Sequence, residues 1–261
     1  MLILILSYII VFSFIISKWS FLRMNSIPSY ALILVFLIKI IAGFLSFSYH
    51  NYYFAGGDSA IYLRGGQDLI DFSRGNPLRY ISLFLNLHRD LPEWESIYSQ
   101  IIYWDSKSYF NMINDNRNAI RFNSLLSLLS FRNTYVHIII LNFVSIIGLV
   151  ALYKSFKRFL PQLPSFLIFM AVFLSPSILF WSSGILKETH TIFFVGLYYL
   201  VLSKIISTQK PVYIFPLFLL LFFVILSRTY FSAFIIISTI YLLSARIFKI
   251  HTLKMNGILL M

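Results

Sequence analysis

The stretch YVHIIILNFVSIIGLVALY, residues 135–153, contains no aspartate, glutamate, lysine, arginine or proline, and it decides the fold class of the chain. Its apolar residues form a continuous run rather than the alternating pattern of a half-buried strand. The run approaches the ~20 residues that a helix needs to cross the hydrocarbon core of a bilayer. Because hydrocarbon offers the backbone no hydrogen-bond partner, such a segment must satisfy its own backbone as a helix.

Six further apolar segments accompany this one, so we predict an all-α polytopic membrane protein with about seven transmembrane helices. They lie at about residues 1–17, 29–48, 163–181, 189–203, 211–227 and 230–245. Pro176 is a point at which the segment 163–181 can break or kink, because proline lacks the N–H that a helix interior needs. The composition agrees, since 59% of the residues are hydrophobic and only 11% are charged, against about 25% charged in a soluble domain.

The charged residues in the connections predict the orientation. The connections 18–28, 154–162, 204–210 and 246–254 carry ten basic residues and no acidic one, which marks their side as cytoplasmic. These basic residues are Lys18, Arg23, Lys154, Lys157, Arg158, Lys204, Lys210, Arg246, Lys249 and Lys254. All nine acidic residues fall on the opposite side. We therefore expect an integral protein of a bacterial inner (cytoplasmic) membrane, with its N-terminus outside and its C-terminus in the cytoplasm.

The distribution of charged residues also divides the chain into three regions and indicates which kinds of partner it binds. Two N-terminal helices (1–48) precede an outer, periplasmic or extracytoplasmic loop (49–134), and about five further helices with a cytoplasmic C-terminus follow (135–261). The formal net charge of +12 belongs to the cytoplasmic fringe, where lysine and arginine meet lipid headgroups. We expect membrane lipids as partners and no nucleic acid. The absence of cysteine excludes a thiolate metal site and a cysteine nucleophile.

The loop 49–134 is the most informative polar region, because loops of this length without structure of their own are uncommon. RYISLFLNLH (79–88) and RNAIRFNSLLSLLSF (117–131) place apolar residues three and four positions apart, which predicts amphipathic helices in the membrane interface. We expect the chemistry of the protein in this loop, which contains the acidic residues Asp58, Asp68, Asp71, Asp90, Glu93, Glu95, Asp105 and Asp115.

The stretch FAGGDSAIYLRGGQDLIDF (54–72) follows the second span directly and is the most specific segment of the loop. Gly56 and Gly57 are expected to end one helix and Asp58 to start the next as its N-cap, with Tyr62 one turn later on the same face. Two interpretations stay open. Either Asp58 only caps the helix and Tyr62 is an interfacial aromatic, or Asp58 is a catalytic carboxylate that takes a proton from an acceptor hydroxyl.

The stretch PSILFWSSGILKETH (176–190) is the second constellation. A helix that begins near Ser183 directs its free N–H groups and positive dipole end at the outer headgroup layer, beside Lys187 and His190. This arrangement suits a lipid phosphate. The alternative is that Lys187 snorkels to the interface while Glu188 sits favourably in a first helical turn.

Other candidates carry weaker signals. Lys39 lies inside the second span, where a charge is costly and indicates a function unless the lysine snorkels. HRD (88–90) has no second ligand cluster at a recognisable spacing, so we assign no metal ligand, and a divalent metal stays a minor alternative. Walker A, Rossmann and HExxH patterns are absent, which argues against a nucleotide-driven pump and a zinc protease. Arg64 leads the candidate contacts to phosphate or anionic lipid, followed by Arg74, Arg117 and Arg121.

Together these features resemble the multi-spanning GT-C glycosyltransferases that use lipid-linked sugars, including bacterial relatives of the protein O-mannosyltransferases. The likeness rests on GGDSAIY (56–62), the amphipathic helices of the loop and PSILFWSSGILKE (176–188), within about residues 50–205. It implies an inverting transfer with Asp58 as general base, beside Tyr62, and a polyprenyl-phosphate leaving group held by basic residues. The implied phosphate contacts are Lys187, His190 and Arg64, and the implied sugar-binding or orienting carboxylates are Asp68, Asp71 and Glu188.

The resemblance predicts a glycosyltransferase with a polyprenyl-phosphate sugar as donor and an envelope glycan, lipid or protein as acceptor, and no certain cofactor. The chain departs from that family in having an additional span before the loop and fewer spans in all. It also stops at MNGILLM (255–261), which resembles the beginning of another apolar run, as expected of a truncated product. Two other classes stay open. One is a surface-polysaccharide polymerase or ligase that relies on outer arginines, and the other is a transporter, flippase or non-catalytic assembly subunit. No internal repeat of the kind found in transporters is visible.

Overall fold

The computed structural model describes residues 1–87, 92–104 and 114–247, and the regular elements among them are all helices, which confirms the all-α prediction. The longer helices are α1 (Leu2–Lys18), α2 (Ser29–Tyr53), α7 (Thr134–Phe159), α10 (Lys187–Thr208), α11 (Ile214–Ser227) and α12 (Thr229–Ile247). The others are α3 (Gly57–Phe72), α4 (Pro77–Leu85), α5 (Pro92–Gln100), α6 (Asp115–Leu129), α8 (Ser165–Phe173), α9 (Pro176–Trp181) and the 3₁₀ turns η1 (Ser20–Leu22) and η2 (Pro211–Tyr213). The HRD stretch (88–90) lies outside the described residues.

Three of these helices, α2, α7 and α10, are long and apolar enough to cross a membrane. Helices α1, α11 and α12, the last as far as Ala245, are apolar but shorter. The segment predicted as one span at 163–181 is instead divided into α8 and α9. The break falls just before Pro176, because proline removes a backbone donor and disfavours a helical conformation at the residue before it. The count of seven spans stays a prediction.

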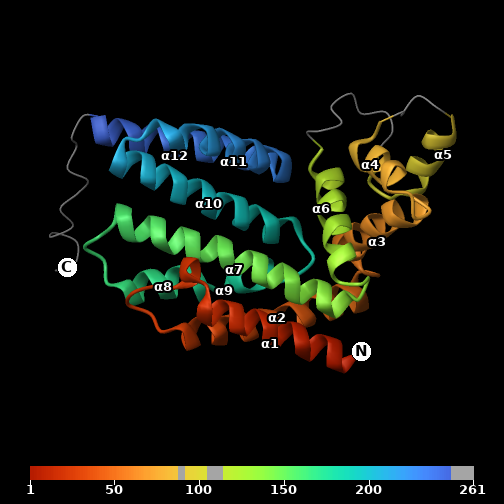
Figure 1. The fold of residues 1–261 in the computed structure, drawn as a ribbon, viewed down its shortest axis with the longest axis horizontal. Coiled ribbons are helices and arrows are strands. Elements are labelled where there is room, and N and C mark those ends of the chain that lie inside the picture. Colours follow the sequence, from red (N-terminus) through yellow and green to blue (C-terminus); the bar gives the residue numbers. More distant parts are fainter. Residues whose placement is uncertain (88–91, 105–113, 248–261) are drawn as a thin grey trace.

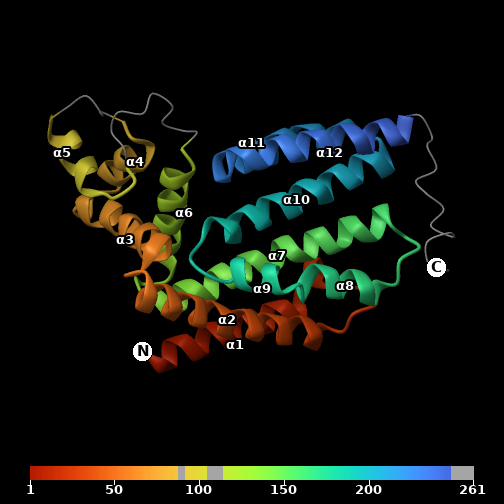
Figure 2. The same cartoon turned by 180° about the vertical axis from the view of Figure 1, so that it is seen from behind.

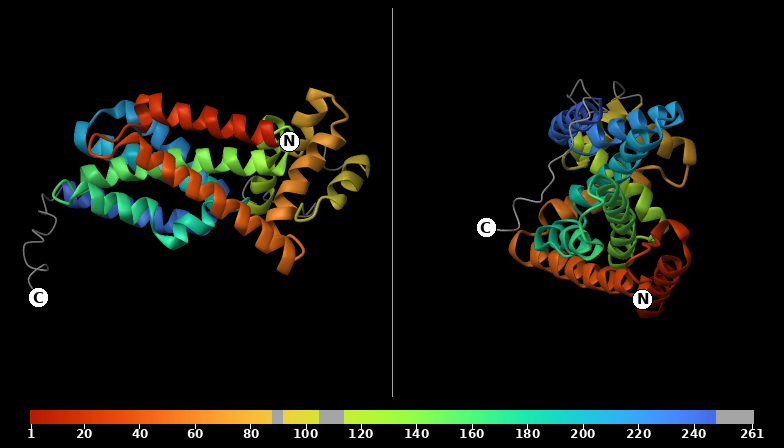
Figure 3. Two further views of the ribbon diagram at one scale, coloured as in Figure 1. Left: turned by 90° about the horizontal axis from the view of Figure 1, so that it is seen from below. Right: turned by 90° about the vertical axis from the view of Figure 1, so that its left-hand side faces the viewer.

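The bundle helices run along one long axis, and α3–α6 form a separate unit at one end of it (Figure 1). Figures 2 and 3 show the same arrangement from other sides, with the N-terminus at the α3–α6 end and α12 ending at the far end. Lys157 and Lys204, near the ends of α7 and α10, mark the far end, whereas the described acidic residues lie in α3, α5, α6 and the first turn of α10. The described charged residues at the far end are therefore basic, whereas the α3–α6 end holds the described acidic residues together with about as many basic ones. The membrane side of each end stays a prediction.

The closest packing in the bundle joins α7 and α10. A methyl group on Gly148 would meet the backbone of Ile192 and Phe193, and one on Gly196 would meet the backbone of Gly148. Small residues let two helix backbones approach closely, as is common between helices in membranes. The two glycines therefore fix α10 against the central helix α7.

Helix α6 crosses the end of α10 and α11 instead of running along the bundle (Figures 1 and 2). Its polar side chains point inward, and the buried ones are Arg117, Arg121, Asn123, Ser124 and Ser127. Three of its four leucines, Leu125, Leu128 and Leu129, are exposed, whereas Leu126 is buried. The buried side of α6 thus mixes polar residues with Ala119, Ile120 and Leu126. The exposed leucines form the kind of apolar outer face that a helix needs in the membrane interface. The interfacial placement of α6 and α4 stays a prediction.

The helix α3 starts two residues earlier than the sequence predicts. Its N-cap is Gly56, with a φ of 95°, so Asp58 lies inside the first turn and does not cap the helix. Gly57 also has a positive φ of 48°. Positive φ is accessible to glycine at little cost, and for this reason the glycine pair turns the chain between α2 and α3.

The linker before α10 is held from inside the bundle by Lys39. This side chain is fully buried, and its Nζ lies 2.9 Å from the Ser182 carbonyl, 2.6 Å from Ser182 Oγ and 3.0 Å from Ser183 Oγ. The Asn142 amide donates to the Ser183 carbonyl at 2.9 Å. Because these side chains bind the backbone of the linker, α10 begins only at Lys187 and not near Ser183, and Lys39 does not snorkel.

Candidate functional site

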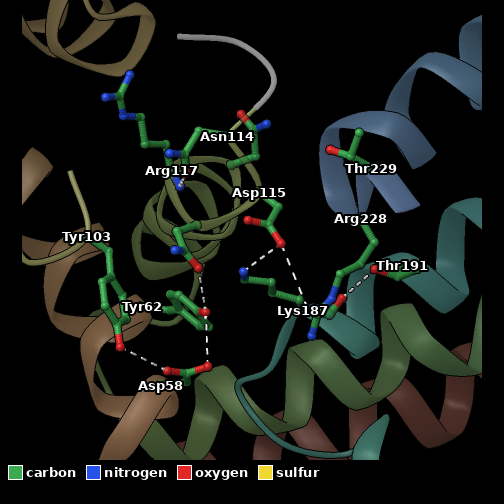
Figure 4. A network of polar contacts seen from close by, with 12 residues as sticks. Asp58, Tyr62, Tyr103, Asn114, Asp115, Arg117, Lys187, Thr191, Arg228 and Thr229 are labelled. Carbon is green, nitrogen blue, oxygen red and sulfur yellow. Dashed lines mark hydrogen bonds and ion pairs between the residues drawn. The ribbon is translucent and has the colours of Figure 1, made fainter. Parts of the chain in front are cut away.

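Polar side chains converge where α3, α6, α10 and the α11–α12 turn meet (Figure 4). We call them the polar cluster, which comprises Asp58, Tyr62, Asp115, Asn116, Lys187, Glu188 and Arg228. The cluster lies at the α3–α6 end of the bundle and joins four segments that are far apart in the sequence. Packing of the helices, rather than local sequence, brings these residues together.

Within the polar cluster, Asp58 is held by two tyrosine hydroxyls. The Tyr62 hydroxyl lies 3.2 Å from Asp58 Oδ2 and 2.9 Å from Asn116 Oδ1, and the Tyr103 hydroxyl donates to Asp58 Oδ1 at 3.4 Å. Burial raises the pKa of the Tyr62 phenol, and the negative charge of Asp58 raises it further, so Tyr62 stays a hydrogen-bond donor at neutral pH. Asp58 itself is exposed. An accessible carboxylate that two phenols orient is suited to take a proton from a hydroxyl group.

The other half of the polar cluster is an ion network around Asp115. Lys187 Nζ lies 2.8 Å from Asp115 Oδ2, and Arg228 Nη1 lies 3.8 Å from the same oxygen. Arg228 also forms an ion pair with Glu188. The Lys187 side chain is only 7% exposed, and its Nζ lies 5.5 Å from the centre of the Tyr62 ring. Two carboxylates thus balance two cations, and Lys187 connects the network to Tyr62.

The structure brings together several of the residues chosen from the sequence. Asp58 and Lys187 both contact Tyr62, one at its hydroxyl and the other over its ring (Figure 4). Glu188 lies in the first turn of α10, where the sequence places it, and pairs with Arg228. Asp58 and Lys187 therefore meet at Tyr62, whereas their membership of one functional site and the chemical role of each residue stay predictions.

A cavity of about 290 Å³ lies beside the ion network, between α7, α9, α10 and α12, and we call it the α9–α12 cavity. Apolar side chains such as Trp181, Ile192 and Phe231 form most of its lining. Glu188 and Arg228 also line it and add charge to one part of an otherwise apolar wall. Apolar cavities with a few placed polar groups are typical ligand sites, and this one fits an amphiphile with a charged head.

Three residues predicted to bind substrate do not reach the polar cluster. Arg64, Asp68 and Asp71 lie on another face of α3, because positions 58 and 62 are one turn apart whereas positions 64, 68 and 71 fall on the far side. There Asp71 pairs with Arg132, and Arg64 is exposed. Burial, and then the charge of Asp71, raises the pKa of Asp68, against the opposing effect of Arg132 and Arg64. These residues form a separate surface group.

His190, predicted as a phosphate contact, makes no hydrogen bond with the ion network. Its ring packs against Phe122, with 4.8 Å between the ring centres, and lines a second cavity. The described residues offer no hydrogen-bond partner to either ring nitrogen. Of the three phosphate contacts implied by the resemblance, Lys187 alone belongs to the polar cluster.

Sequence reasoning missed the roles of Asp115 and Arg228. Asn114 caps α6 by accepting from the Arg117 backbone N–H at 3.0 Å, which places Asp115 in the first helical turn. Arg228 is the one charged residue in the stretch 211–245. A single charge between two apolar runs is costly in a membrane and indicates a function, and this was the signal available for Arg228.

In the part of the chain that the structure describes, no group of three or more histidine, aspartate or glutamate side chains is arranged to hold a metal ion. Comparison with known proteins gives no match to a family model, to a curated protein or to a solved structure.

Proposed function

We propose that the chain is a membrane glycosyltransferase that uses a polyprenyl-phosphate sugar as donor and an envelope glycan, lipid or protein as acceptor. The observation that carries the proposal is the meeting of Asp58 and Lys187 at Tyr62, beside an apolar cavity with charged lining. In this proposal the chain has about seven spans, and the α3–α6 end faces outward because the basic end belongs to the cytoplasm. The reaction then takes place at the outer membrane face.

Asp58 acts as the general base in this proposal. An acceptor hydroxyl attacks the anomeric carbon of the donor sugar, and Asp58 takes the hydroxyl proton. The new glycosidic C–O bond forms while the bond from the anomeric carbon to the phosphate oxygen breaks, and polyprenyl phosphate leaves with the electron pair. Tyr62 and Tyr103 are positioning residues that orient the carboxylate, with hydroxyls at 3.2 and 3.4 Å.

Arg228 is the residue best placed for the leaving phosphate. It lines the α9–α12 cavity, which takes the adjoining isoprenoid chain, and a guanidinium makes paired hydrogen bonds to phosphate. Glu188 and Asp115 already balance Arg228, so the phosphate replaces one carboxylate contact when it binds. Lys187 is nearly fully buried against Asp115, and it keeps that carboxylate and the Tyr62 ring in place.

The variant Asp58→Asn tests the proposed base. Asparagine keeps the size of the side chain but takes no proton, so hexosyl transfer in membranes supplied with polyprenyl-phosphate hexoses falls by about 10²–10⁴-fold. Asp68→Asn is the matched control, because Asp68 belongs to the same helix but lies outside the polar cluster, and we expect it to keep its activity. Unchanged transfer by Asp58→Asn, at equal protein amounts in the membrane, refutes the assignment.

A surface-polysaccharide polymerase or ligase is the second candidate, and two buried arginines of α6 favour it. The guanidinium carbons of Arg117 and Arg121 lie 5.9 and 5.1 Å from the centre of the Trp104 ring. Burial lowers the pKa of Arg121 to about 10, and the charge of Arg117 adds to this effect. If Arg121→Ala abolishes glycan elongation while Asp58→Asn leaves it intact, the second candidate replaces the first.

A further inference from the structure

A second cavity, of about 180 Å³, lies between α6, α10 and α11. It touches a different side of α10 from the α9–α12 cavity, and we call it the α6–α10 cavity. Phe122, Phe194 and Phe223 give it an apolar lining, to which His190 and Arg121 add nitrogen groups. It is therefore an apolar chamber with two places for a polar ligand group.

His190 stands out when it is compared with a second buried histidine. His190 is 2% exposed, and neither of its ring nitrogens has a hydrogen-bond partner among the described residues. His137 is equally buried, yet its Nε2 lies 2.8 Å from Asn123 Oδ1 and its Nδ1 lies 3.3 Å from Ser130 Oγ. A buried polar group without a partner is costly and rare, so His190 points to a ligand in this cavity.

The surroundings of His190 favour a negatively charged ligand group. His190 lies in the first turn of α10, whose N-cap residue makes no side-chain hydrogen bond, and the positive end of a helix dipole attracts anions. Arg121 brings a guanidinium to the same lining. Its position is fixed, since Nε donates to the Phe84 carbonyl at 2.5 Å and Nη1 to Asn118 Oδ1 at 2.8 Å.

The apolar part of the cavity reaches the outer surface of α6. Leu125 lines the cavity and is also 45% exposed. Leu128 and Leu129, one turn further along the same face, are exposed as well. This continuous apolar path suits a hydrocarbon chain whose charged end is drawn toward His190.

We infer that the α6–α10 cavity binds the phosphate group of a lipid. The His190 ring donates a hydrogen bond to a phosphate oxygen, Arg121 supplies positive charge beside it, and the hydrocarbon chain leaves past Leu125. The site lies apart from Asp58 and does not depend on the proposed transfer reaction. Two sources share this chemistry, namely bilayer phospholipids and polyprenyl phosphates.

The experiment measures thermal unfolding of the full chain in detergent with three short-chain probes. Dioctanoyl phosphatidylglycerol and farnesyl phosphate carry a phosphate, whereas dioctanoylglycerol does not. We expect a saturable rise of Tm with at least one phosphate probe and none with dioctanoylglycerol. His190→Leu raises the half-saturating concentration about tenfold, the effect of losing one hydrogen bond to a charged group.

His137→Leu is the matched control. It removes two satisfied hydrogen bonds, so this variant melts lower but keeps its response to the phosphate probe. His190→Leu melts no lower than the wild type without lipid, because the described residues give it no hydrogen bond to lose. In the wild type, the ¹⁵N shifts of the His190 ring, assigned with the variant, move when the probe binds.

A response to dioctanoyl phosphatidylglycerol alone assigns the site to bilayer phospholipid, and a response to farnesyl phosphate alone assigns it to an isoprenoid phosphate. Equal responses of His190→Leu and the wild type, an equal effect of dioctanoylglycerol, or no response to any probe overturns the inference. Asp58→Asn is expected to keep the lipid response. Failure of the proposed reaction and failure of this site are thus distinguishable.

Discussion

Replacing Lys187 with methionine removes one cation from the ion network, and the geometry sets the size of the effect. Breaking a buried ion pair by removing one partner costs about 3–5 kcal/mol, because the other charge is left buried. Here Asp115 is 31% exposed and keeps Arg228 at 3.8 Å, so part of the loss is compensated. We therefore expect Lys187→Met to lower the free energy of unfolding by about 2–3 kcal/mol, somewhat less than the loss of a fully buried partner.

A double-mutant cycle with Asp115→Asn isolates the pair itself. In the Asp115→Asn background the partner charge is gone, so Lys187→Met should cost less than about 1 kcal/mol. The assay is reversible unfolding by SDS in mixed dodecylmaltoside micelles, followed by the fluorescence of the four tryptophans. Lys210→Met, exposed at the other end of the bundle, is the control and should change stability by less than about 0.5 kcal/mol. Equal costs of Lys187→Met in both backgrounds would refute the pairing.

Two further substitutions test the interior of the bundle by the same unfolding assay. Lys39→Met should raise the free energy of unfolding, because it removes a buried charge. The Ser182 and Ser183 hydroxyls keep their hydrogen bonds to helix carbonyls in this variant. A loss of stability would contradict this prediction. Gly196→Leu should destabilise the protein by about 3 kcal/mol or prevent folding, since the α7–α10 contact has no room for a side chain. The control Ala171→Leu, at an exposed position of α8, should leave stability nearly unchanged.

The positions of the helices were predictable because apolar runs and their spacing are local properties of the chain. The segments predicted at 29–48, 135–153 and 189–203 correspond to α2, α7 and α10, and each helix extends beyond its predicted segment at one or both ends. The amphipathic pattern at 117–131 likewise corresponds to α6. The break at Pro176 follows from the covalent structure of proline. The number of helices that cross the membrane does not follow in the same way, because several of them are short.

The partners within the polar cluster were not predictable, because they depend on how helices cross. Arg228 pairs with Glu188 across 40 residues of sequence, and with Asp115 only because α6 lies across the end of α10 and α11. Helical periodicity does explain why Arg64 and Asp68 lie on a different face of α3 from Tyr62.

The first turn of α10 organises both proposed sites. Successive residues of a helix are rotated by about 100°, and so Lys187 points to Asp115, Glu188 to Arg228 and the α9–α12 cavity, and His190 to the α6–α10 cavity. This turn is fixed from two sides. The Lys39 hydrogen bonds hold the linker before it, and the glycine contact between α7 and α10 holds the helix behind it. Lys39, although costly to bury, thereby helps to set the positions of all three side chains at once.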